Sequence, residues 1–291
     1  MINEPKIANK LGQIMAATRW KPVLKECFSL IHRELKITLT PRPHPKKWVF
    51  VVGCYNSGTT LLSEILGSHP MISALPSEGQ YLTDQLPSDH DIGLSRMWVE
   101  REDIYRLAPD SRGVDPERIK YEWAMRLDRR KPIFLEKTPA NAARMPWLEK
   151  HFENAYFIGI VRNGYAVAAG ISHKAKPVHR KAGWPIEMAA RQWMRSNEVM
   201  FEDARKVKNF LWLKYEDLAK DPNLELKKIT DFITPGTSLD IDLSKGWAIH
   251  ERIEPISNMN LQSISKLSNL EVEKIRNICA ASLDQFDYKI E

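Results

Sequence analysis

The chain has 291 residues, with 43 Lys or Arg against 37 Asp or Glu, so its formal net charge is +6. Hydrophobic residues make up 43% of the chain and charged residues 27%, which are ordinary values for a globular protein. This composition excludes a disordered chain, because such chains lack the apolar surface that offsets ordering entropy. The 13 Gly and 18 Pro follow no repeat, which excludes a collagen-like chain.

The cysteines and the charge pattern restrict the class of protein further. Cys27, Cys54 and Cys279 are scattered and odd in number, which is typical of neither a disulfide framework nor a zinc cluster. No stretch approaches the roughly 20 apolar residues of a membrane span, and residues 1–13 lack the apolar core of a signal peptide. We therefore expect a cytoplasmic protein. Basic residues alternate with acidic ones, which favours an enzyme for small polyanions over a nucleic-acid binder.

The chain is expected to begin with an amphipathic helix over residues 5–36, because its apolar residues recur at three- and four-residue steps. This helix either packs on the domain or serves a partner, a membrane surface or a homodimer contact. The proline-rich TPRPHPKK (40–47) then interrupts regular structure. We expect two parts, residues 1–46 and a single domain over 47–291.

Strands and helices alternate through the second part. Buried strands are predicted from continuous apolar runs at 48–53, 133–137, 155–162 and 209–215. Helices are predicted after the first strand and at 140–151, 187–207, 216–233 and 268–283. The fold class is therefore α/β, with a mostly parallel central sheet flanked by helices. Two segments remain: 84–130 is read as helical insertions, and the basic 173–185 as either a surface loop or a flap over an anionic ligand.

A glycine loop connects the first strand to the first helix. GCYNSGTT (53–60) has the spacing G-x-x-x-x-G-x-T of a phosphate-binding loop. In such a loop, backbone amides and the positive end of the following helix hold anionic oxygens. Thr59 stands where a nucleotide triphosphatase needs its lysine. The loop therefore predicts binding of a phosphate-like group without nucleotide hydrolysis.

Two blocks of the chain resemble the sulfotransferase superfamily. NSGTTLLSEILGSHP (56–70) is similar to the family's loop for the 5′-phosphosulfate of 3′-phosphoadenosine 5′-phosphosulfate (PAPS). The block from 134 to 170 is similar to its Lys-Thr-Pro segment, strand and Val-Arg-Asp-Pro (or Gly) turn. Weaker similarities lie at 212–222 and 258–279. The resemblance covers residues 48 to 288 and implies the P-loop NTPase-like sulfotransferase fold.

The resemblance also implies which residues bind the donor. They are Asn56, Ser57, Gly58, Thr59, Thr60, Arg162, Ser172 and Lys174. Arg162 corresponds to the arginine that contacts the 3′-phosphate. Two positions depart from the family pattern: the usual basic residue before SGTT is Asn56, and the usual serine falls on Gly170, two places before Ser172.

Catalytic roles are expected for one lysine and one general base. Lys137 follows a strand end and is expected to stabilise the bridging oxygen of the donor. Glu78 matches the catalytic glutamate of tyrosylprotein sulfotransferases, with a loop cap as the alternative role. His69 is a rival base, although a histidine before proline at a helix end more often caps the helix. His173 and His179 are further candidates, since cytosolic sulfotransferases use a histidine base.

The sequence thus predicts a sulfotransferase that moves a sulfuryl group from PAPS to a hydroxyl or amine of a small-molecule acceptor, leaving PAP (adenosine 3′,5′-bisphosphate). No metal is required in this reaction, because positioning and charge stabilisation carry it. A non-catalytic PAP-type anion-binding protein, a P-loop kinase for a small metabolite and a nucleic-acid binder are the alternatives. The acceptor and the oligomeric state are left open by the sequence.

Overall fold

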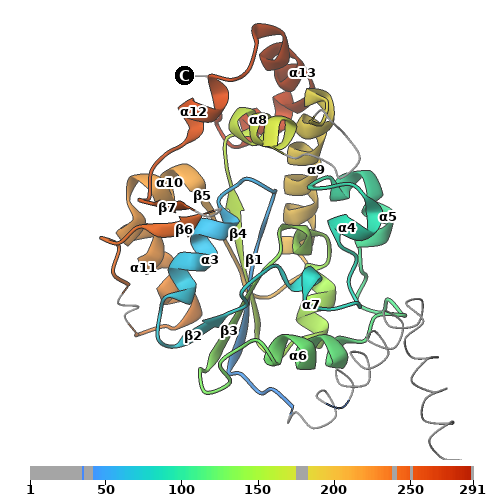
Figure 1. Ribbon diagram of the computed structural model, residues 1–291, viewed down its shortest axis with the longest axis vertical. Helices are drawn as coiled ribbons and strands as arrows, with labels where there is room; N and C mark the ends of the chain where they lie inside the picture. Colours follow the sequence, from blue (N-terminus) through green and yellow to red (C-terminus); the bar gives the residue numbers. More distant parts are fainter. Residues whose placement is uncertain (1–34, 36–41, 175–182, 238–240, 250–251, 290–291) are drawn as a thin grey trace, which may run out of the picture. The chain divides into compact units, whose positions relative to one another are not determined.

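The structure is a computed structural model that describes residues 35, 42–174, 183–237, 241–249 and 252–289 (Figure 1). The predicted helix over residues 5–36 lies outside the described residues apart from Leu35, and so does His179. The chain divides into two compact units, Met1–Pro43 and His44–Glu291. All the elements below belong to the second unit.

A five-stranded sheet forms the centre of this unit. Its strands are β1 (Lys47–Gly53), β2 (Ile72–Ala74), β3 (Ile133–Lys137), β4 (Ala155–Val161) and β5 (Phe210–Lys214). They lie in the order β2-β3-β1-β4-β5, and every pair is parallel. The four predicted strands and the α/β class are confirmed. Strand β2 was not predicted, because three residues are too few for a recognisable apolar run.

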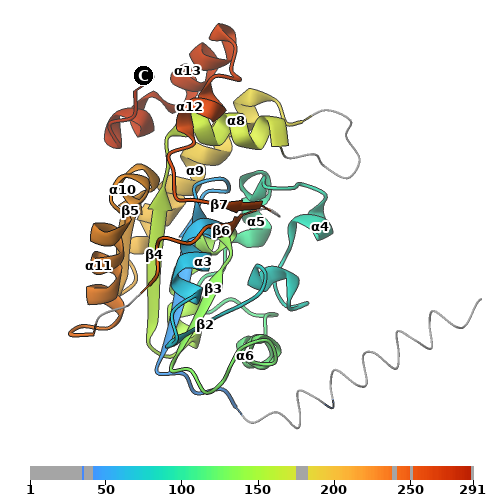
Figure 2. The ribbon, with the colours of Figure 1, turned by 60° about the vertical axis from the view of Figure 1, so that its left-hand side comes forward.

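The side chains of β1 alternate between two cores, one on each face of the sheet. Trp48, Phe50 and Val52 pack in one core, whose helical part includes α6 (Pro116–Ala124), α7 (Met145–His151) and α9 (Ile186–Ala204). Val49 and Val51 pack in the other, against α3 (Thr59–Gly67), α10 (Tyr215–Lys220) and α11 (Pro222–Ile233). Figure 2 shows α3 and α11 covering one face of the sheet. Burial on both faces explains the continuous apolar sequence of β1.

Some predicted helices are divided in the structure. The segment 140–151 forms a short 3-10 helix, η3 (Pro139–Ala143), before α7. The helix predicted over 216–233 is two helices, α10 and α11, because Pro222 lacks the N–H that would continue the first. The side chain of Asp221 instead accepts a hydrogen bond from the Leu224 N–H at 3.0 Å and caps the second helix.

The remaining elements surround this framework. The insertion 84–130 contains short helices, as predicted, together with α6. They are α4 (Asp89–Ile92), η2 (Trp98–Arg101) and α5 (Glu102–Tyr105), preceded by η1 (Gly79–Tyr81). The others are α8 (Gly164–Lys174), α12 (Asn260–Ile264), α13 (Asn269–Gln285) and the antiparallel pair β6 (Trp247–Ile249) and β7 (Arg252–Glu254). Of the helices in the described residues, none is long and apolar enough to cross a membrane.

Parallel pairing brings the carboxyl ends of the strands to one edge of the sheet. Strand β1 ends in the glycine loop, β3 ends at Lys137, and β4 is followed directly by Arg162. The end of β5 leads into Tyr215. Ligands of open parallel sheets bind at this edge.

Candidate active site

A cavity of about 730 Å³ is lined by residues from this edge of the sheet. The glycine loop and the start of α3 form one wall, and the residues that follow β4 and β5 form another. The lining also includes Glu78, Asp89, Arg96, residues of α12 and Lys266. Of the predicted site residues, the cavity is lined by Asn56, Gly58, Thr59, Thr60, Glu78 and Arg162.

The loop presents the beginning of α3 to the cavity. Gly58 precedes the helix with φ at 96°, a left-handed conformation that favours glycine. A Cβ at this position would lie 2.7 Å from a ring carbon of Tyr215, so a side chain is excluded there as well. Within the part of the chain that the structure describes, no side chain caps the helix. Its first N–H groups are therefore available to an anion, whose charge the helix dipole stabilises.

Three buried polar atoms beside the loop have no hydrogen-bond partner among the described residues. They are Asn56 Nδ2, Ser57 Oγ and Arg162 Nη2. Buried polar groups in folded proteins are nearly always bonded, so an unpartnered group calls for an explanation such as a bound ion. All three can donate. This set of donors fits the phosphate and sulfate oxygens of the donor implied by the sequence.

Arg162 is held in a fixed orientation. Its Nε donates to Asn260 Oδ1 at 2.8 Å, and its Nη1 donates to the backbone carbonyl of Asn56 at 3.0 Å. The guanidinium lies 4.3 Å from the centre of the Tyr215 ring. Burial lowers the pKa of Arg162. Because the other two nitrogens are bonded, the unpartnered Nη2 is the atom left for a ligand.

Asn56 connects the loop to two distant segments. Its φ of 64° is a left-handed conformation, which asparagine tolerates better than most residues. Its side-chain Oδ1 accepts a hydrogen bond from Arg96 Nη1 at 2.6 Å. A Cβ added at Gly170 would lie 3.0 Å from Asn56 Nδ2. The two departures from the family pattern are thus neighbours in the fold, and Gly170 leaves the space that the Asn56 side chain fills.

Glu78 and Lys137 form an ion pair with 3.0 Å between Oε1 and Nζ. The other carboxylate oxygen of Glu78 accepts a hydrogen bond from Gln80 Nε2 at 2.9 Å. Burial raises the pKa of Glu78, and the charge of Lys137 opposes this by lowering it. A carboxylate with a raised pKa is suited to accept a proton near neutral pH.

A second carboxylate lies buried behind Glu78. Glu136 in β3 accepts a hydrogen bond from the Gly79 N–H at 2.8 Å and also bonds Thr138 and Asn141. Burial raises the pKa of Glu136 to about 7. The Gly79 carbonyl in turn accepts a hydrogen bond from Trp123 at 3.0 Å. Both polar groups of the Gly79 backbone are therefore fixed, which orients the adjacent Glu78.

Other predicted residues lie apart from the cavity. His69 follows the far end of α3, where its Nδ1 accepts a hydrogen bond from the Met71 N–H at 3.1 Å. Ser172 Oγ donates to the Trp184 carbonyl at 2.7 Å, and Gly170 rather than Ser172 lines the cavity. Lys137 does not itself line the cavity, but its Nζ forms an ion pair with Glu78, which does. His173 is exposed on α8, and the backbone of Lys174 ends that helix.

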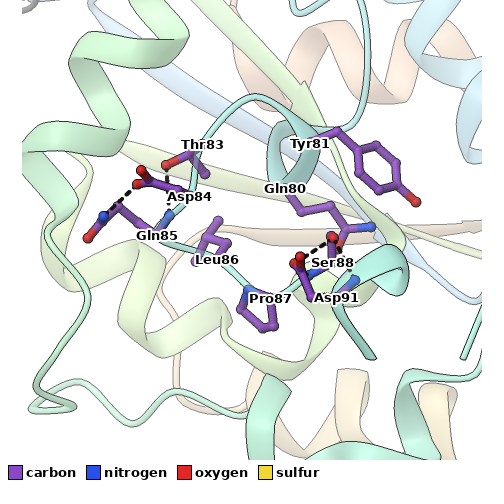
Figure 3. A pocket seen from close by; sticks show the side chains of 9 residues that line it. All are labelled: Gln80, Tyr81, Thr83, Asp84, Gln85, Leu86, Pro87, Ser88 and Asp91. Carbon is purple, nitrogen blue, oxygen red and sulfur yellow. Dashed lines mark hydrogen bonds between the residues drawn. The ribbon is translucent and has the colours of Figure 1, made fainter. Parts of the chain in front are cut away.

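A second hollow of about 550 Å³ lies beside the first and shares Tyr81 with it. Figure 3 shows hydrogen bonds among several of its polar residues. Asp84 accepts from Gln85 Nε2 at 2.7 Å, and Ser88 Oγ donates to Asp91 at 2.6 Å. Gln80 Oε1, by contrast, is a buried acceptor without a partner among the described residues.

Sequence reasoning missed several residues of the site, among them Arg96, Tyr215 and Asn260. Arg96 belongs to an irregular segment that has no periodicity to interpret. Tyr215 was seen only as part of a strand and a weak family similarity, and Asn260 only as part of the C-terminal run. A signal for Tyr215 was available, because it follows the fourth parallel strand as Arg162 follows the third.

Comparisons with known proteins identify the family and the fold. The chain is 23% identical over 237 residues to protein-tyrosine sulfotransferase A of Caenorhabditis elegans, covering 78% of this chain and 58% of that protein. This chain thus spans little more than half the length of that relative. Sulfotransferase STF1 from Mycobacterium tuberculosis shares the fold, with a TM-score of 0.54, 14% identity and coverage of 86% of this chain and 81% of the other. Sulfotransferase STF9 from Mycobacterium avium gives a TM-score of 0.50 at 14% identity, covering 91% and 82%.

The family itself is shown by its sequence model. The model of the sulfotransferase family matches residues 49–235, which run from β1 through the loop, Glu78, Lys137 and Arg162 to the end of α11. The chain therefore belongs to the sulfotransferase family and has its P-loop-like α/β fold.

Proposed function

We propose that this sulfotransferase uses PAPS as its donor and releases PAP. The observation that carries the proposal is the set of unpartnered donors, Asn56 Nδ2, Ser57 Oγ and Arg162 Nη2, around the uncapped start of α3. Thr59 and Thr60 also line the cavity, and their hydroxyls can donate to a ligand there. Arg162 would bind the 3′-phosphate, and the loop would bind the 5′-phosphosulfate.

Glu78 is the proposed general base. When bound, PAPS supplies an electrophilic sulfur and a phosphate leaving group. Glu78 takes the proton from the acceptor hydroxyl or amine as the new bond to sulfur forms and the bond from sulfur to the phosphate oxygen breaks. Lys137 stabilises the negative charge that develops on that oxygen. The ion pair with Lys137 opposes the effect of burial on the pKa of Glu78 and so favours the ionised form that accepts the proton.

The acceptor is proposed to be a small molecule with a hydroxyl or amine. It would approach by the second hollow, which adjoins the cavity at Tyr81. The name of the C. elegans relative supports a second candidate, the phenol of a tyrosine in a polypeptide. Transfer of labelled sulfate to simple phenols, alcohols and amines, compared with a tyrosine-containing peptide, distinguishes the two.

Cytoplasmic location is part of the proposal. Cys54 and Cys279 are free, buried thiols, as expected in a reducing compartment. Burial raises the pKa of Cys54 to about 12, so this thiol next to the loop stays protonated.

Calorimetric titration with PAP, ADP and Mg-ATP tests the donor. We expect selective binding of PAP. A preference for Mg-ATP would support a kinase instead, and tight PAP binding without transfer to any acceptor would support a non-catalytic binding protein. Binding of none of these ligands would contradict the donor assignment.

A further inference from the structure

We infer that Arg96 is a binding residue for the 5′-anionic group of the donor, and that Asn56 positions it there. The inference rests on the proposed function, since it assigns a further residue to the same site. Arg96 lines the cavity together with Gly58, Thr59 and Thr60. It is forty residues from the loop in sequence and reaches it only through the fold.

The hydrogen bond between Arg96 and Asn56 fixes the guanidinium beside the loop. Nη1 donates to Asn56 Oδ1 at 2.6 Å, which uses one of the five N–H donors of the arginine. The described residues provide no further hydrogen bond to this guanidinium. Its other donors are therefore available to a ligand in the cavity, which is also lined by Glu78 and Asp89, two carboxylates whose pKa burial raises and the charge of Arg96 lowers.

Asn56 also touches the second arginine of the cavity. Its backbone carbonyl accepts from Arg162 Nη1 at 3.0 Å, while its side chain accepts from Arg96. One residue of the loop thus holds two cations against the same cavity. Like charges placed together in a partly buried site repel each other unless an anion lies between them. The pair is consequently suited to a ligand with several negative groups.

The backbone of Arg96 is held by a hydrogen bond of its own, in addition to the one made by the side chain. Its φ is 62°, a conformation that needs support in a residue other than glycine. The support comes from Asp89, a buried carboxylate that accepts from the Arg96 N–H at 2.7 Å. Asp89 also accepts from the hydroxyl of Tyr55, the residue next to Asn56, at 2.8 Å. The backbone carbonyl of the preceding residue, Ser95, accepts a hydrogen bond from Trp184 Nε1 at 2.9 Å.

These contacts distinguish Arg96 from an ordinary surface arginine. A surface arginine such as Arg101 pairs with its own neighbour, Asp103, and needs no special backbone conformation. Arg96 instead takes a left-handed backbone, bonds a loop residue and is oriented toward a cavity of unpartnered donors. Since Asn56 carries no charge, Arg96 supplies the positive charge at this end of the loop.

The test measures binding of two ligands that differ only in the 5′-phosphate: PAP and adenosine 3′-monophosphate. Calorimetry is done on the full chain and on Arg96→Gln, with Arg101→Gln as the matched control. We expect Arg96→Gln to weaken PAP binding about tenfold or more, the value of a charged hydrogen bond. Binding of adenosine 3′-monophosphate should not change, and the control should bind both ligands as the original chain does.

Two further variants test the charge directly. Arg96→Lys should lose less PAP affinity than Arg96→Gln, and it serves as the test if Arg96→Gln does not fold. Adding Asn56→Lys to Arg96→Gln places a cation in the loop itself and should restore part of the lost PAP affinity. A double variant as weak as Arg96→Gln alone would count against the assignment.

The outcomes separate this inference from the proposed function. If the original chain does not bind PAP, the donor assignment fails. If it binds PAP and Arg96→Gln binds it equally well, only the role of Arg96 is overturned. An equal loss for PAP and for adenosine 3′-monophosphate would also overturn it, because the variant would then have disturbed the cavity as a whole.

Discussion

The side chain of Asn56 lies against Gly170, so close that a Cβ on the glycine would be 3.0 Å from Nδ2 and 3.3 Å from Cγ of the asparagine. In sequence these are two separate departures from the family pattern. In the fold they are one feature, because the smallest residue on α8 leaves room for the loop residue that bonds Arg96.

Gly170→Ala is expected to weaken PAP binding without destabilising the fold. The added methyl group would displace Asn56, while Ala in a helix is itself favoured over Gly by about 0.5–1 kcal/mol. Calorimetry with PAP and thermal unfolding measure the two effects separately. Added to Asn56→Ala, the same substitution should cause little further loss of affinity, since neighbouring residues do not act additively. Additive losses would contradict the contact.

Glu78→Gln should lower kcat by about 10²–10⁴-fold, the usual contribution of a general base, and leave PAP binding nearly unchanged. The amide cannot take the proton of the acceptor. Steady-state kinetics and PAP calorimetry are the measurements. The control is Glu100→Gln, an exposed glutamate of the insertion that should keep full activity. Full activity of Glu78→Gln would remove Glu78 from the mechanism.

Lys137→Met should shift the acid limb of the pH profile of kcat/KM to higher pH. Activity needs ionised Glu78, so it falls when pH drops through the pKa of that carboxyl. Burial raises this pKa and Lys137 is the main group that lowers it, so removing Lys137 should move the pKa further upward. Kinetics from pH 5 to 9 locate the limb. An acid limb that stays in place or moves to lower pH would show that the ion pair does not lower the pKa of Glu78.

Arg162→Ala should weaken PAP binding by about 1.5–3 kcal/mol, the range for hydrogen bonds to charged groups. The loss is expected for adenosine 3′-monophosphate as well, because Arg162 is assigned to the 3′-phosphate. Calorimetry with both ligands checks this, and Arg130→Ala is the control because that side chain is 91% exposed. An unchanged affinity would exclude Arg162 from the donor site.

Glu136 should make folding stability depend on pH. Burial raises its pKa to about 7, above the ordinary value of 4.5, so the folded protein holds a proton that the unfolded chain has released. The contribution of Glu136 to stability is therefore complete below pH 4.5 and is lost as pH rises through 7. Urea unfolding between pH 5 and 8 should show a smaller decline for Glu136→Gln than for the original chain. Equal slopes would contradict the raised pKa.

The framework of the site was predictable because its sequence signals are local. Four buried strands show as apolar runs, and parallel pairing then places the loop, Lys137 and Arg162 at one edge without further information. The sequence did not reveal which side chains contact one another in the fold. Ser172 was predicted to bind the donor because the family's serine falls on Gly170, two places earlier, but the Ser172 hydroxyl bonds the Trp184 carbonyl at 2.7 Å.

Arg96 could not be predicted, because its position depends on tertiary contacts. Its segment has neither a helical nor a strand period, and its backbone is fixed by Asp89 through a bond that only burial makes strong. Strand β2 and the β6–β7 pair were missed for another reason. Each strand has three residues, and such strands are stable only through their neighbours.

The position of β1 at the centre of the sheet has a consequence for synthesis of the chain. Trp48 pairs with Phe134 on one side and with Ala155 on the other, so neither partner has been made when β1 leaves the ribosome. Pairing between such distant segments makes folding slow. Until β3 and β4 arrive, the apolar run from Trp48 to Val52 stays exposed to aggregation. Expression at low temperature or with a chaperone that binds apolar segments should therefore increase the yield of folded protein.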